Sequence, residues 1–348
     1  MKRFAGILFL ALWWSSCGGP GPLRVAVVTD PQHAQEAEAF LRGVQYALQT
    51  SPHPKVEWVS LQPKELSAQL DQVTVVLAGP MDLRDLRALL TLGESQNRPV
   101  IVGANHTLDL ARFPHAWRVP LNSDYLANAA VFFAVKMLKK KRLAAVGNPQ
   151  DPEMALMFSD LRRYLKAYQV PDTLTVLPLE HLQNPRALRR WLRRVRPEVI
   201  FCLLPPGEAP EALSQLRKAG FRGAVIGFHE WQPQTPEGEV YGVTDYCSAD
   251  PRLQDFIAQY TQATGAVPTL WDALGYDAML LILTVAKQLE APTPENFMAR
   301  IRTVAVKGLT GTLEYGTSHD PIGKRPLIVQ FTPEGVKVVA RPAVSPYR

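Results

Sequence analysis

The sequence predicts an α/β protein made of two doubly wound, Rossmann-like lobes joined by a hinge. From Leu23 onward, short β-branched runs alternate with amphipathic helical patterns, which is typical of parallel sheets covered by helices on both faces. The alternation occurs as two similar sets in tandem, which indicates two lobes rather than one large sheet. A chain of 348 residues is also long enough for each lobe to bury its own core.

The first set of elements lies before the chain reaches residues 117–120, where we expect it to cross over. Its expected strands are 24–29, 56–61, 73–78 and 99–102, and its expected helices are 34–49, 63–70 and 83–95. The second set has expected helices at 123–140, 152–168, 185–195 and 209–219, with strands at 142–146, 173–177, 199–204, 224–228 and 240–246.

The remaining elements lie toward the C-terminus. Apolar residues at helical spacing predict a long buried helix over 271–289, and a shorter helix follows at 294–304. A short strand is expected at 312–315. The tail strands 325–331 and 336–340 are joined by a turn at 332–335, which predicts a hairpin against the second lobe.

The N-terminus has the layout of a secretory signal. Lys2 and Arg3 precede an apolar run, and small residues surround Cys17. A cysteine directly after Ser15 and Ser16 resembles a bacterial lipobox, which implies a signal peptide over 1–16, lipidation of Cys17 and a flexible tether over 17–22. Trp14 departs from the aliphatic residue usual in that pattern, so an ordinary secreted protein with a nearby cleavage site is the alternative.

Composition favours binding over catalysis. The chain is 47% hydrophobic with a mean hydropathy of −0.07, and no internal apolar run is long enough for a transmembrane helix. A net charge of +6 is too mild to predict nucleic-acid binding. The sequence has no G-x-G-x-x-G after its first strand, no phosphate-binding G-x-x-x-x-G-K-[ST], no H-E-x-x-H and no G-x-S-x-G. We therefore expect neither an enzyme nor a cofactor.

Histidines, cysteines and arginines each have a structural interpretation. The seven histidines are scattered without metal-ligand spacing, so no metal site is expected. Cys202 lies in an apolar run and fits a buried small side chain, Cys247 ends an expected strand, and the sequence leaves open whether the two pair. Six arginines between Arg186 and Arg196 alternate with an apolar stripe and predict a solvated helix face, with contact to anionic lipid or a partner as the alternative.

Four short motifs between 265 and 323 connect the chain to a known family. They are Gly265 to Pro268 (GAVP), Tyr276-Asp277-Ala278, Gly308 to Gly311 (GLTG) and His319 to Gly323. In this order and spacing the chain resembles the type I periplasmic solute-binding proteins of the Leu/Ile/Val receptor group, which serve ABC transporters. The resemblance implies three crossings between the lobes, with 23–119 plus 248–318 as lobe 1 and 120–247 plus 319–348 as lobe 2.

A ligand is expected in the crevice beyond the carboxyl ends of the strands, where helix N-termini offer free N–H groups. The expected binding residues are Ala104, Asn105, His106 and Thr107 from the first lobe, and Gln150, Asp151, Phe228, His229, Glu230 and Trp231 from the second. The resemblance places the family's stacking tyrosine at Pro152 or Glu153, so it is missing here. Of the residues where the family pairs the ligand's ammonium, only Glu230 could serve.

The resemblance implies an exported, lipid-anchored substrate-binding protein without enzymatic activity. It would capture a small polar solute, an amino acid or a related amide or carboxylate, by hinge closure and deliver it to an ABC-type permease in the membrane. One alternative is a lipoprotein regulator on the same fold, with a vestigial cleft and a protein partner; an enzyme of unrecognised type is another. An enclosed cavity between the lobes would favour the receptor.

Overall fold

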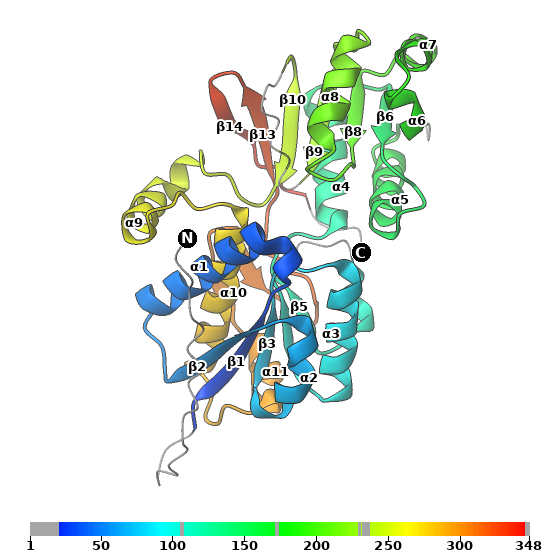
Figure 1. Ribbon diagram of the computed structural model, residues 1–348. Helices are drawn as coiled ribbons and strands as arrows, with labels where there is room; N and C mark the ends of the chain where they lie inside the picture. The colour runs from blue at the N-terminus through cyan, green and yellow to red at the C-terminus, as the bar shows by residue number, and fades with distance from the viewer. Residues whose placement is uncertain (1–20, 105–107, 171–173, 229–230, 232–236, 345–348) are drawn as a thin grey trace, which may run out of the picture.

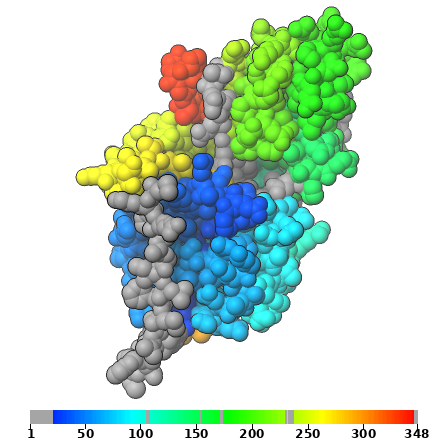
Figure 2. All heavy atoms as spheres, viewed as in Figure 1, coloured from blue at the N-terminus to red at the C-terminus, as the bar shows by residue number. Residues whose placement is uncertain are grey.

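The computed structural model describes residues 21–104, 108–170, 174–228, 231 and 237–344. Figure 1 shows two lobes, blue to cyan below and green above, each built on a sheet with helices on both faces. The predicted fold class, α/β with two doubly wound lobes, is confirmed. In Figure 2 the lobes form separate masses that approach each other over the start of α1 (Ala34–Thr50).

The first lobe contains a five-stranded parallel sheet of order β2-β1-β3-β4-β5. Its strands are β1 (Leu23–Val28), β2 (Val56–Leu61), β3 (Val75–Ala78), β4 (Val100–Val102) and β5 (Ala116–Arg118). On one face pack α1, α10 (Leu270–Ala286) and α11 (Pro294–Ile301), with the small β11 (Ala305–Lys307) and β12 (Thr312–Glu314) hairpin. On the other face pack α2 (Pro63–Gln69) and α3 (Leu83–Ser95).

Helices α1 and α10 are in unusually close contact, and two glycines make this possible. A Cβ at Gly43 would lie 2.0 Å from the carbonyl oxygen of Asp272, and one at Gly275 would lie 2.1 Å from that of Phe40. Any larger residue would push the helices apart. Asp272 also closes a capping box with Thr269 at the start of α10 and accepts a hydrogen bond from Arg42 of α1 at 2.8 Å.

The second lobe contains a seven-stranded sheet of order β14-β13-β10-β9-β8-β6-β7. Its strands are β6 (Leu143–Val146), β7 (Thr175–Leu177), β8 (Val199–Cys202), β9 (Ala224–Phe228), β10 (Val240–Thr244), β13 (Leu327–Thr332) and β14 (Gly335–Ala340). Helices α4 (Ser123–Phe132) and α5 (Pro152–Ala167) cover one face, and α7 (Pro185–Val195) and α8 (Ala209–Lys218) cover the other. The expected tail hairpin is confirmed as β13 and β14, antiparallel to each other, with β13 paired to β10.

The chain passes between the lobes three times. It leaves the first sheet after β5 to form α4, leaves the second after β10 to form α9 (Gln254–Thr264) and α10, and returns after β12 to form β13. Crossings of this kind make a hinge. We call the connections 119–122, 245–250 and 315–326 the crossing segments.

Several local features differ from the sequence expectation. The helix expected over 123–140 changes to a π-helix at Phe133–Met137, so the α-helix proper ends at Phe132. Sequence periodicity gave no signal for the three-residue strand β5 or for α9, which packs on α1 through Phe256 and Tyr260 against Tyr46. Cys202 and Cys247 are both buried free thiols, so they do not pair.

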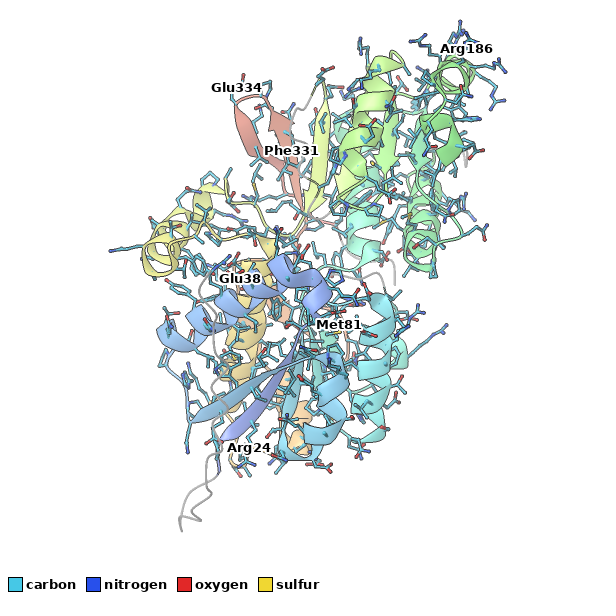
Figure 3. All side chains as sticks on the ribbon, viewed as in Figure 1. Arg24, Glu38, Met81, Arg186, Phe331 and Glu334 are labelled. Carbon is cyan, nitrogen blue, oxygen red and sulfur yellow. The ribbon has the colours of Figure 1, made fainter. Side chains whose placement is uncertain are left out.

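The arginine-rich helix is as predicted. Leu188 and Trp191 of α7 are buried, whereas all six arginines from Arg186 to Arg196 are exposed. Figure 3 shows Arg186 at the outer end of the second lobe, far from the space between the lobes. Among the residues that the structure describes, no helix combines the length and apolar character needed to cross a bilayer.

Candidate functional site

Both sheets direct the carboxyl ends of their parallel strands toward the space between the lobes (Figure 1). In each sheet the strand order reverses once, between β1 and β3 in the first lobe and between β6 and β8 in the second. Doubly wound sheets bind ligands at such a reversal because the connecting loops diverge there and leave a crevice. The loops at 29–33 and 79–82 therefore face those at 147–151 and 203–207 as candidate binding elements.

The loops of the first lobe bring three ionisable side chains together. Asp30 follows β1 and is 5% exposed, and its backbone N–H donates to the carbonyl oxygen of Pro80 at 2.9 Å. His33 ends a 3-10 turn at Pro31–His33, and its Nε2 lies 3.0 Å from Oδ1 of Asp82, which precedes α3. Oxygen and imidazole nitrogen atoms in this arrangement are the atom types that hold a metal ion.

The predicted binding residues have different places. Asn105, His106, Thr107, His229 and Glu230 lie outside the described residues, so their roles stay predictions. Ala104 is fully buried behind the edge of the first sheet. Gln150 is exposed, and its N–H donates to Oδ1 of Asn148 at 3.0 Å. Phe228 is half-buried against the core under α4 and α5.

Asp151 and Trp231, the other two predicted residues, are tied into the second lobe. Oδ1 of Asp151 accepts the N–H of Met154 at 3.1 Å, so Asp151 caps the start of α5. Trp231 is 3% exposed, and its ring occupies the place where a side chain at Gly227 would be, since a Cβ there would lie 1.8 Å from Cε3 of the indole. Phe331 of β13 holds the other side of the indole edge to face, with ring centroids 6.1 Å apart.

A cavity of about 780 Å³ lies between the lobes on the side of β10 and β13. Of the predicted residues that the structure describes, only Trp231 lines it. The first lobe contributes the starts of α1 and α10, including Glu36 and Trp271, and the second contributes Tyr246 and Phe331. Figure 3 shows Phe331 on β13. No sequence pattern marks these residues as cavity walls, because helix starts and hairpin strands reach the cavity only through the packing of the lobes.

Polar groups converge on this cavity from both lobes. Its described lining contains one carboxylate, Glu36, and no lysine, arginine or histidine. Nε1 of Trp231 and Nε1 of Trp271 are buried donors with no hydrogen-bond partner among the described residues. The start of α10 also lies at the wall, together with the residues before it from Val267. Its capping box uses the N–H groups of Thr269 and Asp272, so those of Leu270 and Trp271 are the ones that the helix leaves unused. The cavity therefore offers one anionic group and several neutral donors.

Charged and polar side chains hold the crossing segments together. Arg118, at the end of β5, donates from Nε to Oδ1 of Asp320 at 2.6 Å, and Asn122 donates to the other oxygen of Asp320 at 2.8 Å. Oδ2 of Asp245 accepts the N–H of Leu121 at 3.0 Å and lies 3.4 Å from Nζ of Lys324. These bonds connect each crossing segment to the other two.

The family-like motifs at 276–278 and 308–311 meet beside the crossing segments. Asp277 of α10 accepts the N–H groups of Leu309 and Thr310 at 2.7 and 2.8 Å, and the hydroxyl of Thr310 at 2.5 Å. A Cβ at Gly308 would lie 2.4 Å from that carboxylate, which explains the glycine. Lys324 also donates to Thr310 and, like Asp245 and Asp277, is completely buried or nearly so. We call Asp245, Asp277, Thr310 and Lys324 the crossing cluster.

Burial shifts the pKa values of Lys324 and Asp277 in the crossing cluster. It lowers the pKa of Lys324, although the charges of Asp245 and Asp277 act in the opposite direction. Burial also raises the pKa of Asp277, against the charge of Lys324 and the hydrogen bonds from Thr310 and Leu309. Each charge in this cluster is therefore tolerated only because its partners are in place.

The chain is similar to known proteins in its sequence family and in its fold. A family model described as periplasmic binding protein matches residues 69–330. A sequence search found no significant match among curated proteins. The leucine-binding protein LivK from Thermotoga maritima superposes with a TM-score of 0.76 at 18% identity, covering 92% of this chain and 98% of that one.

Two further solved structures are similar. An ABC transporter substrate-binding protein from Desulfitobacterium hafniense, in complex with Leu, has a TM-score of 0.79 at 15% identity and covers 92% of this chain and 100% of that one. A solute-binding protein of an ABC transporter from R. palustris, in complex with benzoate, has a TM-score of 0.75 at 16% identity, covering 93% and 98%. At such identities the likeness establishes a shared fold.

Proposed function

This chain belongs to the periplasmic binding protein family, and on that premise we propose that it captures a small polar solute between its two lobes by hinge closure. The observation that carries the proposal is the cavity of about 780 Å³, whose walls come from both lobes. Its size falls in the range of roughly 300–1,000 Å³ typical of small-molecule sites. A guest that contacts both walls stabilises the closed form, because only that form offers both sets of contacts.

The charges around the cavity favour an amino acid or a related amide or carboxylate. The carboxylate of Glu36 suits an ammonium or amide N–H group. The N–H groups at the start of α10 suit a carboxylate or carbonyl oxygen. The aromatic walls suit an apolar side chain. Leucine and benzoate, bound by two of the structural neighbours, both combine a carboxylate with an apolar group.

We place the moving parts at the crossing segments. The division expected from the sequence, 23–119 plus 248–318 against 120–247 plus 319–348, separates the two sheets. Closure by rotation about these segments would narrow the cavity without breaking either sheet. The predicted binding residues at the strand ends would then approach the guest. They are Asn105, His106, Thr107, Gln150, Asp151, His229 and Glu230.

The protein would act outside the cytoplasm, attached through a lipid on Cys17, and would deliver its solute unchanged to an ABC-type permease. Residues 1–20 lie outside the described part, so this proposal depends on the lipobox-like sequence. Expression in a bacterial host tests it. Cys17→Ser should move the protein from the membrane fraction to the soluble fraction, and an unchanged distribution would contradict lipid anchoring.

The solute proposal is tested by thermal shift against amino acids, small amides, short peptides and carboxylates. A solute at 100 times its Kd should add about 2.7 kcal/mol to the free energy of unfolding. Glu36→Gln should weaken the binding of an ammonium-bearing solute tenfold or more, which is about 1.4 kcal/mol. Glu38→Gln is the matched control, because Glu38 is an exposed carboxylate on the same helix, outside the cavity lining (Figure 3).

Other outcomes of the screen would count against the proposal. If no small solute shifts the melting temperature, the regulator with a vestigial cleft becomes the better hypothesis. If Glu36→Gln and Glu38→Gln affect binding equally, the solute lies elsewhere between the lobes. Mass spectrometry of the recovered solute separates capture from turnover, since a receptor returns it unchanged.

A further inference from the structure

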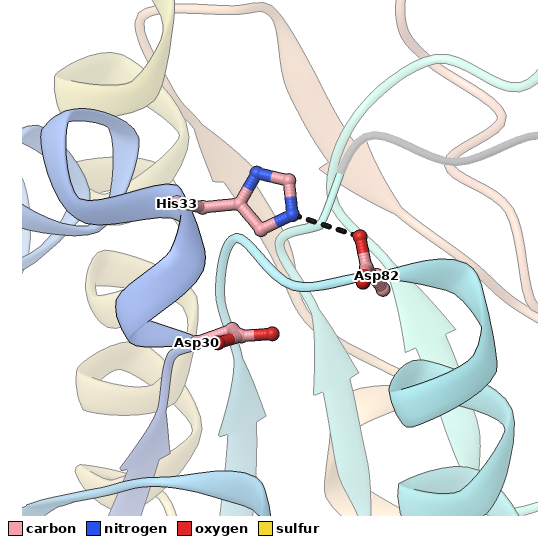
Figure 4. A group of neighbouring side chains, drawn as sticks. All are labelled: Asp30, His33 and Asp82. Atoms are coloured by element: carbon pink, nitrogen blue, oxygen red, sulfur yellow. Dashed lines mark hydrogen bonds and ion pairs between the residues drawn. The ribbon is translucent and has the colours of Figure 1, made fainter.

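Three potential metal ligands converge at the strand-order reversal of the first sheet. Asp30, His33 and Asp82 each offer one ligand atom, and these atoms all lie within 4.8 Å of one another. Figure 4 shows Asp30 and His33 reaching from the turn between β1 and α1 toward Asp82, just before α3. The sequence could not reveal this group, because Asp82 lies 49 residues from His33 and belongs to another loop.

Asp30 lacks a partner for its charge. The residue is 5% exposed, and Oδ1 of its carboxylate accepts the N–H of Gln32 at 2.9 Å. Oδ2 is buried and has no hydrogen bond among the described residues, and Asp30 forms no ion pair there. A buried carboxylate without a counter-charge is costly, and native structures compensate it by pairing or by a metal ion.

We propose that Asp30, His33 and Asp82 bind one divalent transition-metal ion, with Zn²⁺ the best match. Zinc is held by histidine nitrogen at about 2.0–2.1 Å and by carboxylate oxygen at about 2.0–2.2 Å, and it often has three protein ligands. Imidazole with carboxylates suits zinc and its neighbours in the first transition row better than calcium or magnesium. The remaining position takes water or another oxygen ligand.

The geometry requires only modest movement. Tetrahedral ligands at these bond lengths lie about 3.4 Å apart, and Nε2 of His33 is already 3.0 Å from Oδ1 of Asp82. The side chains of His33 and Asp82 are 35% and 58% exposed, so both can turn to admit the ion, whereas the buried Asp30 is the fixed ligand. The ion would replace the present hydrogen bond between His33 and Asp82 and neutralise Asp30.

Calorimetric titration of the chelator-treated protein with zinc sulfate, without any solute, tests the proposal separately from solute capture. The wild type should bind one zinc ion per chain at this site. Asp30→Asn, His33→Ala and Asp82→Asn should each weaken that binding tenfold or more. Asp30→Asn keeps Oδ1 for the N–H of Gln32, and neither His33 nor Asp82 caps its following helix through its side chain, so the variants should fold.

Two variants serve as controls. His53→Ala and Asp85→Asn remove another histidine and another carboxylate from the same lobe and should bind zinc as the wild type does. A variant is folded if its circular dichroism spectrum and melting temperature in chelator equal those of the wild type. If Asp30→Asn fails that check, the His33→Ala and Asp82→Asn variants decide whether the site binds zinc. The proposal is overturned if the wild type binds no zinc, or if His33→Ala and Asp82→Asn retain wild-type affinity.

Discussion

The crossing segments and the strand-end loops of the second lobe are held in opposite ways. In the crossing segments, bonds join residues far apart in sequence, such as Arg118 to Asp320 and Leu121 to Asp245. In the loop after β6, the N–H of Gln150 donates to Asn148, the N–H of Met154 donates to Asp151 and the N–H of Asn148 donates to Sδ of Met154, with the partners two to six residues apart. The crossing segments are thus held by contacts across the whole fold, whereas these bonds of the loop are local.

This difference suits the hinge closure that we propose. A hinge that carries buried charges can rotate only as a connected unit, so the two lobes keep their register while they approach. A loop with local bonds keeps its shape in either position of the lobes and can meet a guest without reorganising the core. The predictions below alter the two regions in turn, beginning with the most buried charge.

Lys324→Met should have the largest effect on stability. It removes the buried ammonium that faces Asp245 and Asp277, which leaves those carboxylates without their cation. Breaking a buried pair on one side costs about 3–5 kcal/mol. Urea unfolding should show this loss, whereas Lys337→Met, on the exposed side of β14, should change stability by less than about 0.5 kcal/mol. A cost below about 1 kcal/mol for Lys324→Met would mean that the crossing cluster contributes little.

Asp250→Asn should have an intermediate, pH-dependent effect. Asp250 ends the second crossing segment, its side chain is 1% exposed, and it pairs with Arg252 at 2.9 Å and with Arg341, beyond β14, at 2.7 Å. Burial alone would raise the pKa of Asp250, but the hydrogen bonds from Arg252 and the charge of Arg341 outweigh it, so the pKa is lowered. Because both arginines are partly exposed, the asparagine variant should lose about 1–2 kcal/mol near neutral pH.

The sign of the pH dependence follows from that lowered pKa. The folded state holds the Asp250 proton less tightly than the unfolded chain, so the stabilisation is complete above the unfolded pKa of about 3.9 and is lost as the pH falls through the lower folded pKa. The stability difference between wild type and Asp250→Asn should therefore be constant from pH 5 to 8 and shrink below about pH 4. A difference that grows on acidification would contradict this pairing.

The layered fold could be predicted because its signals are local. Strands β8 and β9 are continuous apolar runs, and β1 departs from such a run only at Arg24. Helix α7 carries its apolar stripe, its Asn184 cap and its Pro185 within one short stretch. Strand β5 gave no such signal, since it has three residues and ends in Arg118, whose burial depends on Asp320. Sequence periodicity indicates only which side of a segment faces its own core. It cannot indicate β5, because Arg118 of this strand bonds to Asp320, 202 residues away.

The candidate site was predictable only in part for the same reason. Topology placed the strand-end loops at the space between the lobes, and Trp231, which follows β9, lines the cavity there. In the sequence, Glu36 has the pattern of a surface position of a helix, and Trp271 has that of a core position. They become cavity walls because α1 and α10 start beside β10 and β13, and that placement comes from contacts between the lobes.

Asp151 gives the smallest expected effect and the sharpest test of the loop. If Asp151 acts as the cap of α5, Asp151→Ala should lower the free energy of unfolding by about 1 kcal/mol. Asp151→Asn should change it by only about 0.3 kcal/mol, because asparagine retains an oxygen that can accept the N–H of Met154. Thermal unfolding without solute measures this cap. The same two variants, assayed with a bound solute, separate the cap from a contact: a solute that touches the carboxylate should bind Asp151→Asn more weakly although the helix is intact. Equal solute affinity in wild type and Asp151→Asn would leave Asp151 with a role in α5 alone, and would assign recognition to groups that the packing of the two lobes brings together.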